Sequence, residues 1–359
     1  MLKKLDIYII KKFLGTFFLT LALFILIAIV FDVVEKLEDF MGDKVPLSEI
    51  IFDYYLNFIP YFATLFTPLF LFVAVIFFTS RMAYRSEIVA ILNSGITFHR
   101  MLLPYFIAAG LVTVLNIYAN HWIIPDANKK SFAFTDAHVG YTPHNPGNNI
   151  HMQIARDEFM YIENFNISDS SGYKFAYEKF EDGKLLYKMR SDRIVWNAAN
   201  KKWNLKNYAE RFNDSIRESV RFGKDTLLFY NFIPNDLKHD VHAMKSLNAR
   251  ELNARIKELK MRGADDVKSY EIEKYMRTSF PFAIPILTLI AIALSSRKVR
   301  GGIGLHIGLG IAISFTYLLL LQFSQTFATN GNLPAVIGVW IPNLMFAVLA
   351  VFLYRLAPK

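Results

Sequence analysis

The sequence predicts an α-helical integral membrane protein with six transmembrane helices and an inserted all-β, jelly-roll-like extracytoplasmic domain. Hydrophobic residues make up 53% of the 359 residues, which is more than an ordinary soluble enzyme carries. Uncharged apolar runs recur six times, each close to or above the roughly 20 residues that a helix needs to cross a bilayer. Between the third and fourth runs lie short alternating segments joined by Gly and Asn turns, a pattern typical of β-strands.

The apolar runs cover residues 13–31, 54–80, 101–124, 278–296, 301–327 and 333–353. The first run is longer than the apolar core of a signal peptide and lacks a small-residue cleavage site, so we expect it to be retained as a span. The second run contains Pro60 and Pro68. Proline removes a backbone hydrogen bond from a helix, and we interpret both residues as packing kinks rather than as a moving hinge.

Basic residues predict the orientation, because cytoplasmic loops carry the excess of Lys and Arg. Four groups fall on one side of the predicted membrane: Lys3, Lys4, Lys11 and Lys12; Arg81, Arg85 and Arg100; Arg297, Lys298 and Arg300; and Arg355 with Lys359. The loop after the first span is mainly acidic, and residues 328–334 carry no charge. We therefore expect both termini in the cytoplasm and the β domain outside it.

Composition excludes several classes of function. The net charge of +9 is concentrated at these loop positions, which argues against nucleic-acid binding. Cysteine is absent, so the chain has no disulfide and no nucleophilic thiol. No catalytic triad, paired carboxylates or HExxH motif indicates an enzyme, and we expect no cofactor and no metal. The glycine-rich segment GGIGLHIGLG lacks the Gly-Lys-Ser/Thr of a phosphate loop, and the middle of the spans holds no Asp, Glu, Lys or Arg, which argues against an ion-coupled transporter.

The predicted domains are transmembrane helices 1–3 in residues 1–124, a β domain in 125–245, a helical connector in 246–277 and transmembrane helices 4–6 in 278–359. The alternating runs of the β domain are residues 159–167, 173–180, 184–196, 203–212 and 217–222. Their turns, EDG and NAANKK, favour a sandwich or a jelly roll. The connector is expected to hold one helix between Ser246 and Gly263 and a second over 266–277 that leads into the fourth span.

Residues 81–100, RMAYRSEIVAILNSGITFHR, are predicted to form a short helix on the cytoplasmic face. Its apolar residues have the i, i+3, i+4 spacing of one helix face: Ile88, Ile91 and Leu92. Ser86 and Glu87 open the helix, and Gly95 lies where it ends. A short helix in this position is suited to contact with another protein.

Three segments carry a resemblance to a known family. They are SEIVAILNSGITFHRML, SLNARELNARIKELKMRGADDVKSYEIEKYMRTSFPF and GGIGLHIGLGIAISFTYLLLLQFSQTFATNGNLPAVIGVWIPNLMF. Together they resemble the LptF/LptG family of lipopolysaccharide export permeases, and the resemblance covers all six spans in order. The opening LDIYIIKKFLGTFFLTL and the later VVEKLEDF resemble the LptG branch more than the LptF branch.

The resemblance implies a non-catalytic permease subunit of an ABC transporter in the bacterial inner membrane, with its β domain in the periplasm. The expected partners are a dimer of an LptB-like ATPase, an LptF-like permease subunit and an LptC-like periplasmic jelly-roll protein. The complex would extract lipopolysaccharide and pass it to a periplasmic bridge of jelly rolls. Removing acyl chains from a bilayer costs about 0.8 kcal/mol per CH₂, so a chain without a nucleotide site needs such a motor.

In this family the loop between the second and third spans is a coupling helix that enters a groove of the ATPase. By its position in the motif, Glu87 is the residue expected to meet the ATPase. The residues expected to support it are Arg85, Ser86, Ile88, Leu92 and Gly95. The alternative is that Glu87 only caps its own helix or pairs with Arg85 on the surface.

An apolar cavity wall is expected to contact the lipid, and its candidate residues are Phe24, Phe31, Phe66, Phe72 and Tyr317. Each of them can instead face bulk lipid or pack between helices. The family's LptG branch carries a basic cluster at the outer end of the first span to hold lipid phosphates, whereas this chain reads FDVVEKLED there. Candidate replacements are Lys36, Lys44, Lys129 and Lys130. A lipid with fewer phosphates, or a metal-bridged contact through the carboxylates, are the alternatives.

Two further interpretations remain open. The chain can be the LptF-type partner subunit or an exporter of another lipid. It can also be a non-transporting, membrane-anchored β-domain binding protein whose loop is an ordinary connector. Association with an ATPase distinguishes the transporters from the last class.

Overall fold

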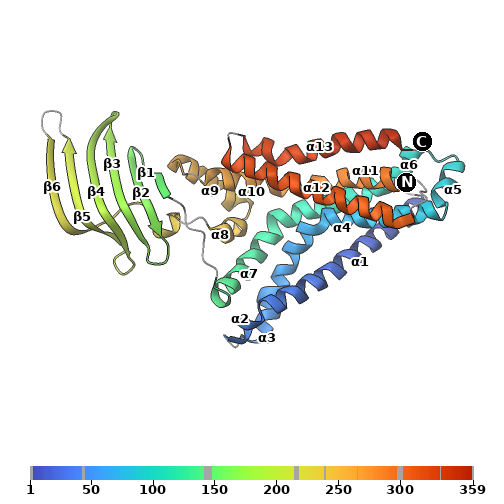
Figure 1. Cartoon of the computed structure of the whole chain (residues 1–359), viewed down its shortest axis with the longest axis horizontal. Helices are drawn as coiled ribbons and strands as arrows, with labels where there is room; N and C mark the ends of the chain where they lie inside the picture. Colours follow the sequence, from blue (N-terminus) through green and yellow to red (C-terminus); the bar gives the residue numbers. More distant parts are fainter. Residues whose placement is uncertain are drawn as a thin grey trace. The chain divides into compact units, whose positions relative to one another are not determined.

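The computed structural model describes residues 3–42, 45–140, 148–213, 218–237, 240–264, 266–296, 302–331 and 333–357. The chain divides into two compact units. One unit, the helical unit, comprises Met1–Gly140, Lys245–Ala249 and Glu271–Lys359, and the other, the β unit, comprises Tyr141–Met244 and Arg250–Tyr270. The first strand of the sheet, residues 148–155, lies outside the five alternating runs predicted from the sequence. Figure 1 labels the elements of both units.

Six helices in the described part of the chain are long and apolar enough to cross a membrane: Lys4–Glu35, Leu47–Tyr84, Phe98–His138, Val267–Ser295, Gly304–Asn330 and Ala335–Leu356. They confirm the predicted number of spans. Four elements are regular helices over most of their length, namely α1 (Lys4–Glu35), α4 (Leu56–Tyr84), α12 (Gly302–Asn330) and α13 (Ala335–Leu356). The others contain breaks: α6 (Phe98–Tyr118) passes through the π-helical η2 (Ala119–Ile123) into α7 (Ile124–His138), and α10 (Val267–Ser279) passes through the 3₁₀ turn η4 (Phe280–Phe282) into α11 (Ala283–Ser295).

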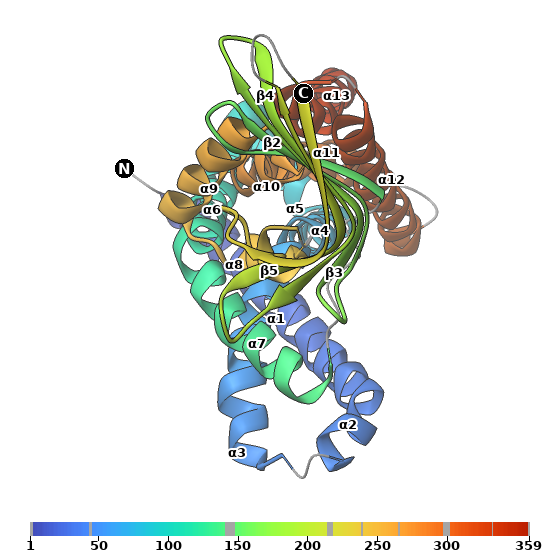
Figure 2. The ribbon, with the colours of Figure 1, turned by 90° about the vertical axis from the view of Figure 1, so that its left-hand side faces the viewer.

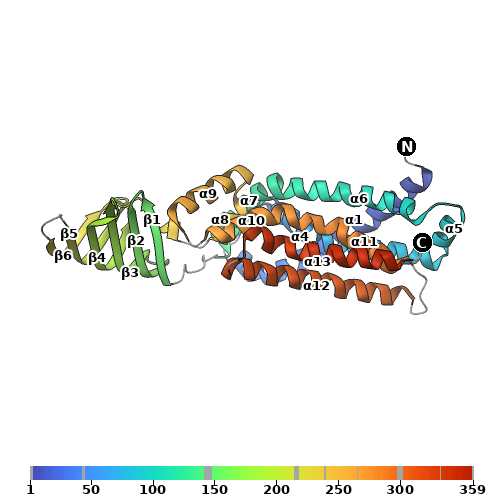
Figure 3. The same ribbon diagram turned by 90° about the horizontal axis from the view of Figure 1, so that it is seen from above.

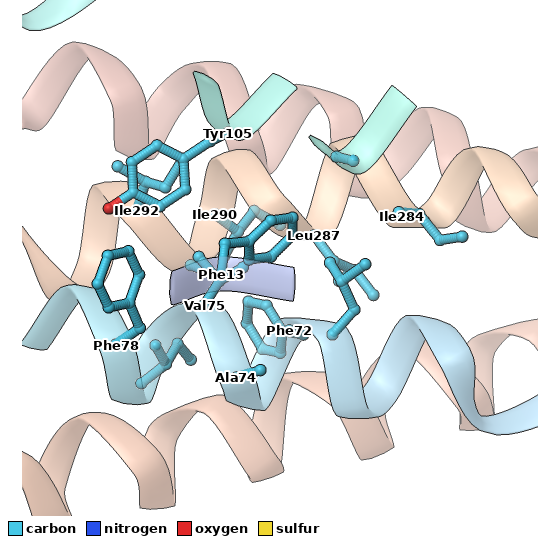
Figure 4. Close-up of a cluster of buried hydrophobic side chains, with 14 of the residues drawn as sticks. Phe13, Phe72, Ala74, Val75, Phe78, Tyr105, Ile284, Leu287, Ile290 and Ile292 are labelled. Atoms are coloured by element: carbon cyan, nitrogen blue, oxygen red, sulfur yellow. The ribbon is translucent and has the colours of Figure 1, made fainter. Parts of the chain in front are cut away.

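The α4 helix lies at the centre of the helical unit. Its buried face, which includes Phe72 and Val75, packs against Phe13 of α1, Tyr105 of α6 and Leu287 of α11 (Figure 4). Hydrocarbon gives helices no hydrophobic reason to associate, so close packing holds such a bundle together. The core therefore depends on shape rather than on burial from water.

Glycines on the C-terminal helices permit this close packing. A Cβ built on Gly310 of α12 would lie 2.3 Å from the Cδ1 of Ile76 on α4, and one on Gly338 of α13 would lie 2.4 Å from the Cβ of Ala328 on α12. Figure 3 shows α12 and α13 side by side. Gly310 of the fifth span and Gly338 of the sixth thus let neighbouring helices approach closely.

Pro68 interrupts the hydrogen bonds of α4 without breaking the helix. A proline at this position leaves the carbonyl of Thr64, four residues earlier, without its helical donor. The Nδ2 of Asn116 on α6 donates a hydrogen bond of 3.2 Å to this carbonyl. A neighbouring helix therefore satisfies the freed group, which is the condition for proline in a membrane helix.

The β unit contains one antiparallel sheet of six strands in chain order: β1 (Asn148–Ala155), β2 (Glu158–Asn166), β3 (Ser171–Glu181), β4 (Lys184–Asn197), β5 (Lys202–Asn213) and β6 (Glu218–Leu228). The inserted antiparallel β domain is confirmed. Asp182 and Gly183 both have positive φ angles, of 48° and 76°. Their backbone suits the tight hairpin that the EDG turn predicts.

The inner face of the sheet is apolar and is covered by the chain that follows β6. Phe175 and Trp203 are buried on it, and Tyr230 and Phe232 pack over them. The ring of Phe232 is stacked on Trp203 at 4.9 Å between centroids, and the indole Nε1 of Trp203 donates a hydrogen bond of 2.9 Å to the Phe232 carbonyl. The domain thus closes its core with its own chain and with no disulfide.

The connector forms the two predicted helices. After α8 (Val241–Ser246), α9 spans Ala249–Arg262 and buries Leu252, Ile256 and Leu259. Gly263 follows with a φ of +59°, the left-handed conformation that ends a helix. The next helix, α10, leads directly into the fourth span.

Candidate partner-docking and lipid-binding sites

The short helix predicted within residues 81–100 is α5 (Glu87–Asn93). Its apolar side chains anchor it to the core of the helical unit, since Ile88 is 3% exposed, Ile91 is 9% exposed and Leu92 is partly buried. The opposite face is open, and Val89 on it is 54% exposed. One face of α5 is therefore anchored to the core of the helical unit, and the opposite face is exposed.

Two left-handed residues set the limits of α5. Ser86, immediately before it, has a φ of 61°, and Gly95, just after it, has a φ of 82°. No atom lies within 4 Å of a Cβ built on Gly95, so backbone conformation and not space favours glycine there. The next helix, α6, begins at Phe98 with Thr97 as its cap, because the Thr97 hydroxyl accepts a hydrogen bond from the Arg100 backbone amide.

Glu87 is half-buried, and its contact is with α1 rather than with its own loop. Its Oε2 accepts a hydrogen bond of 3.3 Å from the hydroxyl of Tyr8. No ion pair joins Glu87 to Arg85 among the described residues. The sequence left two local roles open for Glu87, namely capping its own helix and pairing with Arg85. The described structure does not show the pairing with Arg85.

A stronger contact fixes α1 beside α5. Asp6, near the start of α1, is 2% exposed and receives two hydrogen bonds, of 2.7 and 2.6 Å, from the guanidinium of Arg100 at the start of α6. This is the bidentate geometry in which arginine binds carboxylate most strongly. Sequence reasoning did not single out Asp6 or Tyr8, and their only signal was polarity at the edge of an apolar run.

The first residues of α1 and the last residues of α13 lie at the same end of the helical unit as α5 (Figure 3). A hydrogen bond between the hydroxyl of Tyr354 and the Nε2 of His99 joins α13 to α6 at this end. Exposed Arg81 and Arg85 lie just before α5. This end of the unit is therefore polar and basic, with α5 on its surface.

Some of the predicted lipid-binding residues meet at a cavity of about 210 Å³ between α4, α11 and α12. Phe66 and Tyr317 both line it, and the ring of Phe24 on α1 packs against Phe66 at 4.5 Å between centroids. The wall is almost entirely apolar. Its other residues are Leu65, Pro68, Leu69, Phe280, Leu287, Ser314 and Leu318.

The remaining aromatic candidates lie elsewhere. Phe72 is fully buried in the core of the helical unit and has no exposed surface. Phe31 is 72% exposed on the C-terminal half of α1. The two residues are thus not brought to the cavity that Phe66 and Tyr317 share.

Polar groups at the cavity were missed by sequence reasoning. The hydroxyl of Tyr317 donates to the Oδ1 of Asn343 at 2.9 Å, and the Nδ2 of Asn343 donates to the Ser279 carbonyl at 2.6 Å, next to the break in span four. The hydroxyl of Ser314 is buried with no hydrogen-bond partner among the described residues. Serine and asparagine inside otherwise apolar spans were the available signal.

The C-terminal end of α1 holds Lys36 in a compact polar cluster. The Lys36 ammonium lies 2.7 Å from the Oδ1 of Asp32, and the hydroxyls of Tyr54 and Tyr55 each donate to Asp32 at 3.1 Å. The ammonium also lies 4.5 Å from the centre of the Tyr54 ring. Asp32 therefore neutralises Lys36, which is 17% exposed.

The other basic candidates differ in their surroundings. Lys129 and Lys130 are both exposed on α7, and Lys129 lies 3.8 Å from Asp126. The Lys130 side chain forms no ion pair with any residue that the structure describes. Lys44 lies outside the described residues. No group of three or more acidic or histidine side chains that could hold a metal ion occurs in the described ranges.

The comparison with known families agrees with this arrangement. The model of the family described as lipopolysaccharide export system permease LptF/LptG matches residues 7–356, which is nearly the whole chain. The chain belongs to the LptF/LptG family. The match includes all six membrane helices, α5 and the inserted sheet, so the resemblance predicted from the sequence is confirmed.

A curated relative points to one branch of the LptF/LptG family. The chain is 21% identical over 355 residues to the lipopolysaccharide export system permease protein LptG of Escherichia coli O6:H1 (strain CFT073), and the alignment covers 97% of each chain. The chain is therefore a multi-pass membrane protein of the permease family of the lipopolysaccharide export system.

Proposed function

We propose that this chain is the LptG-like permease subunit of an ATP-driven complex that extracts lipopolysaccharide from the inner membrane. The observation that carries the proposal is α5, a helix rigidly seated by Ile88 and Ile91 with an open outer face, at the position of the family's coupling helix. Glu87, at the first position of α5, is the residue that meets an LptB-like ATPase dimer. Tyr8 holds its carboxylate before the ATPase binds.

The proposed orientation places α5 and both termini in the cytoplasm. Arg81, Arg85 and Arg100 lie at this end of the helical unit, which agrees with the excess of basic residues on the cytoplasmic side. The β unit, inserted between the third and fourth spans, is then periplasmic. The energy for extraction comes from the partner ATPase, because this chain carries no phosphate-loop motif.

The lipid is proposed to enter beside the cavity lined by Phe66 and Tyr317. The apolar wall suits acyl chains, and Phe24 extends it toward α1. Exposed Phe31 on the outer half of α1 supplies apolar surface closer to the membrane face. The fully buried Phe72 instead packs α4 against its neighbouring helices, since no part of its side chain is exposed.

Lipid phosphates are proposed to meet the basic residues near the outer end of the unit. Lys130 is the strongest candidate, because it is exposed and forms no ion pair within the described ranges, whereas Asp32 already neutralises Lys36. Replacing Lys130 with Glu should reduce crosslinking of lipid to this chain more than Lys36→Glu does. Equal crosslinking by Lys130→Glu and the unchanged chain would remove Lys130 from the site.

The remaining proposed partners are an LptF-like permease subunit and an LptC-like periplasmic protein. Exposed apolar side chains on α1 and α12, such as Leu26 and Phe315, provide surface for another membrane subunit. The sheet has two edge strands, β1 and β6. Unpaired edges readily accept a further strand, so addition of a jelly roll from a partner is expected at one of them.

The test is purification of the complex from its native host, followed by identification of the bound lipid by mass spectrometry. The proposal predicts a nucleotide-hydrolysing subunit, a second permease and lipopolysaccharide in the same particle. A different lipid would reassign the cargo. A chain that purifies without any ATPase would contradict the transporter and favour a membrane-anchored binding protein.

A further inference from the structure

The outer face of the β sheet, opposite its apolar core, contains an open groove of about 740 Å³. Its size falls within the range of about 300–1,000 Å³ that is usual for ligand sites. The groove crosses the strands rather than following them. Nothing in the proposed export route through the membrane helices uses it.

A single row of directly paired residues forms the groove. The row runs from β1 to β6 through His151, Tyr161, Ala176, Arg190, Ala209 and Phe222. Since neighbouring strands lie about 4.8 Å apart, the row from Tyr161 to Phe222 covers about 19 Å. The groove is therefore long enough for an extended ligand of several linked rings.

Small side chains give the groove its floor. Ala176 and Ala209 flank Arg190 on the two adjacent strands, so the long arginine side chain lies between two small ones. The sheet also bends at this level, because Lys174 and Asn207 have left-handed φ angles of 52° and 51°. Figure 2 shows the strands curving along their length.

The charges of the groove are paired except at its centre. Lys174 lies 2.7 Å from Glu163, and Lys188 pairs with Glu178, so these four side chains neutralise one another along the two sides. The hydrogen bond that the Lys174 ammonium donates to the Glu163 carboxylate raises the pKa of Lys174 above its ordinary value, as expected for a paired ammonium. These pairs supply no net charge to a ligand.

Arg190 differs from these neighbours. Among the residues that the structure describes, its guanidinium takes part in no hydrogen bond and no ion pair. Asp192 and Asn207, which also line the groove, are likewise unpaired within the described part of the chain. The centre of the groove thus offers one free cation, one free carboxylate and one free amide.

Aromatic rings form the two ends. His151 and Tyr161 lie with their ring centroids 4.7 Å apart at one end, and Phe222, which is 82% exposed, forms the other. Phe222 therefore presents an open aromatic ring at its end of the groove. The flat, electron-rich face of such a ring packs well against the C–H face of a sugar.

We propose that this groove binds an acidic oligosaccharide, namely the phosphorylated or carboxylated sugar head of the exported glycolipid. The guanidinium of Arg190 has the planar fork that matches a phosphate or a carboxylate. Asp192 and Asn207 bind sugar hydroxyls, and the aromatic ends hold sugar rings. The identity of the sugar as part of the cargo rests on the proposed function, while the groove itself does not.

The charge pattern favours a sugar over an acidic peptide. A peptide rich in Asp and Glu would place several carboxylates near Asp192, where like charges repel, while only the Arg190 guanidinium, among the described lining residues, is free to balance them. A saccharide with one anionic group and many hydroxyls satisfies Arg190 and Asp192 together. The single unpaired cation therefore selects a ligand of low charge density.

The test is calorimetric titration of the purified full-length chain with a deacylated, phosphorylated core oligosaccharide. The same sugar after removal of its phosphates and a poly-glutamate peptide serve as comparison ligands. The phosphorylated sugar should bind, its dephosphorylated form should bind at least tenfold more weakly, and the peptide should not compete. A peptide that binds as well as the sugar would overturn the proposal.

Four variants locate the binding. Arg190→Ala should weaken binding at least tenfold, and Ala209→Trp, which fills the floor, should abolish it. Arg156→Ala and Phe229→Ala remove an exposed arginine and an exposed phenylalanine of the same domain outside the groove, and should leave binding unchanged. The proposed binding site would be refuted if the unchanged chain did not bind the sugar, or if Arg190→Ala and Ala209→Trp bound it as tightly as the unchanged chain does. Loss of ATPase association in the complex would instead refute the proposed function and leave this result standing.

Discussion

Asp6 and Arg100 form a bidentate ion pair that ties the start of α1 to the start of α6, directly beside α5. The Asp6 side chain is 3% exposed and that of Arg100 is 33% exposed, so the carboxylate is held away from solvent. Removing one partner leaves the charge of the other without an opposite charge beside it. The N-terminal end of α1 is thereby fixed, whereas its C-terminal half carries exposed Leu26 and Phe31.

Asp6→Ala should lower the melting temperature of the purified chain, because Arg100 loses the carboxylate that holds it. Thermal unfolding in detergent measures the effect. Arg156→Ala serves as the control, since its pair with Asp157 is 3.7 Å long and exposed and such pairs contribute little. The swapped chain, Asp6→Arg with Arg100→Asp, should recover part of the loss. Equal melting temperatures for Asp6→Ala and Arg156→Ala would contradict this account.

Asn116→Leu should destabilise the helical unit by about 1–3 kcal/mol, because the Thr64 carbonyl then has no donor in the membrane interior. The matched test restores a donor within α4. Pro68→Ala supplies a backbone N–H to Thr64, so it should be more favourable in the Asn116→Leu chain than in the unchanged chain. If the two substitutions had additive effects on the free energy of unfolding, the Asn116 side-chain amide and the backbone N–H of residue 68 would not be alternative donors to the Thr64 carbonyl.

Ser314→Ala should leave the melting temperature unchanged or raise it, because the substitution removes a buried hydroxyl that has no partner among the described residues. Ser314→Phe should instead fill much of the cavity that Phe66 and Tyr317 line. We expect lipid extraction in reconstituted vesicles to fall several-fold with Phe and to stay intact with Ala. Normal extraction by a stably folded Ser314→Phe chain would exclude this cavity from the lipid route.

Some features of the fold follow directly from local sequence patterns. Six apolar runs, the EDG hairpin and the helix stops at Gly95 and Gly263 each depend on nearby residues, and the structure contains all of them. The first strand of the sheet, β1, was not among the predicted runs, since NNIHMQIA is short and follows a loop. The covering of the sheet by Tyr230 and Phe232 was also missed, because it depends on contacts with β3 and β5.

The candidate sites show the same division. The position of α5 and the burial of Ile88 follow from periodicity, whereas the Tyr8 contact of Glu87 joins residues 79 positions apart. The sequence made Lys36 a candidate for holding lipid phosphate, but in the fold Asp32 pairs with it and Tyr54 and Tyr55 donate hydrogen bonds to Asp32. Pairing between distant residues is set by helix packing, which no local pattern encodes.

The central claim is that Glu87 transmits the action of a partner ATPase, and one measurement tests it most directly. The complex is purified with the unchanged chain, with Glu87→Gln, with Glu87→Lys and with Glu49→Lys as a control on the opposite side of the predicted membrane, and ATP hydrolysis is measured alongside the amount of ATPase bound. We expect Glu87→Lys to lose the ATPase or reduce hydrolysis at least tenfold, Glu87→Gln to show a smaller loss, and Glu49→Lys to match the unchanged chain. Full association and full hydrolysis with Glu87→Lys would contradict the claim.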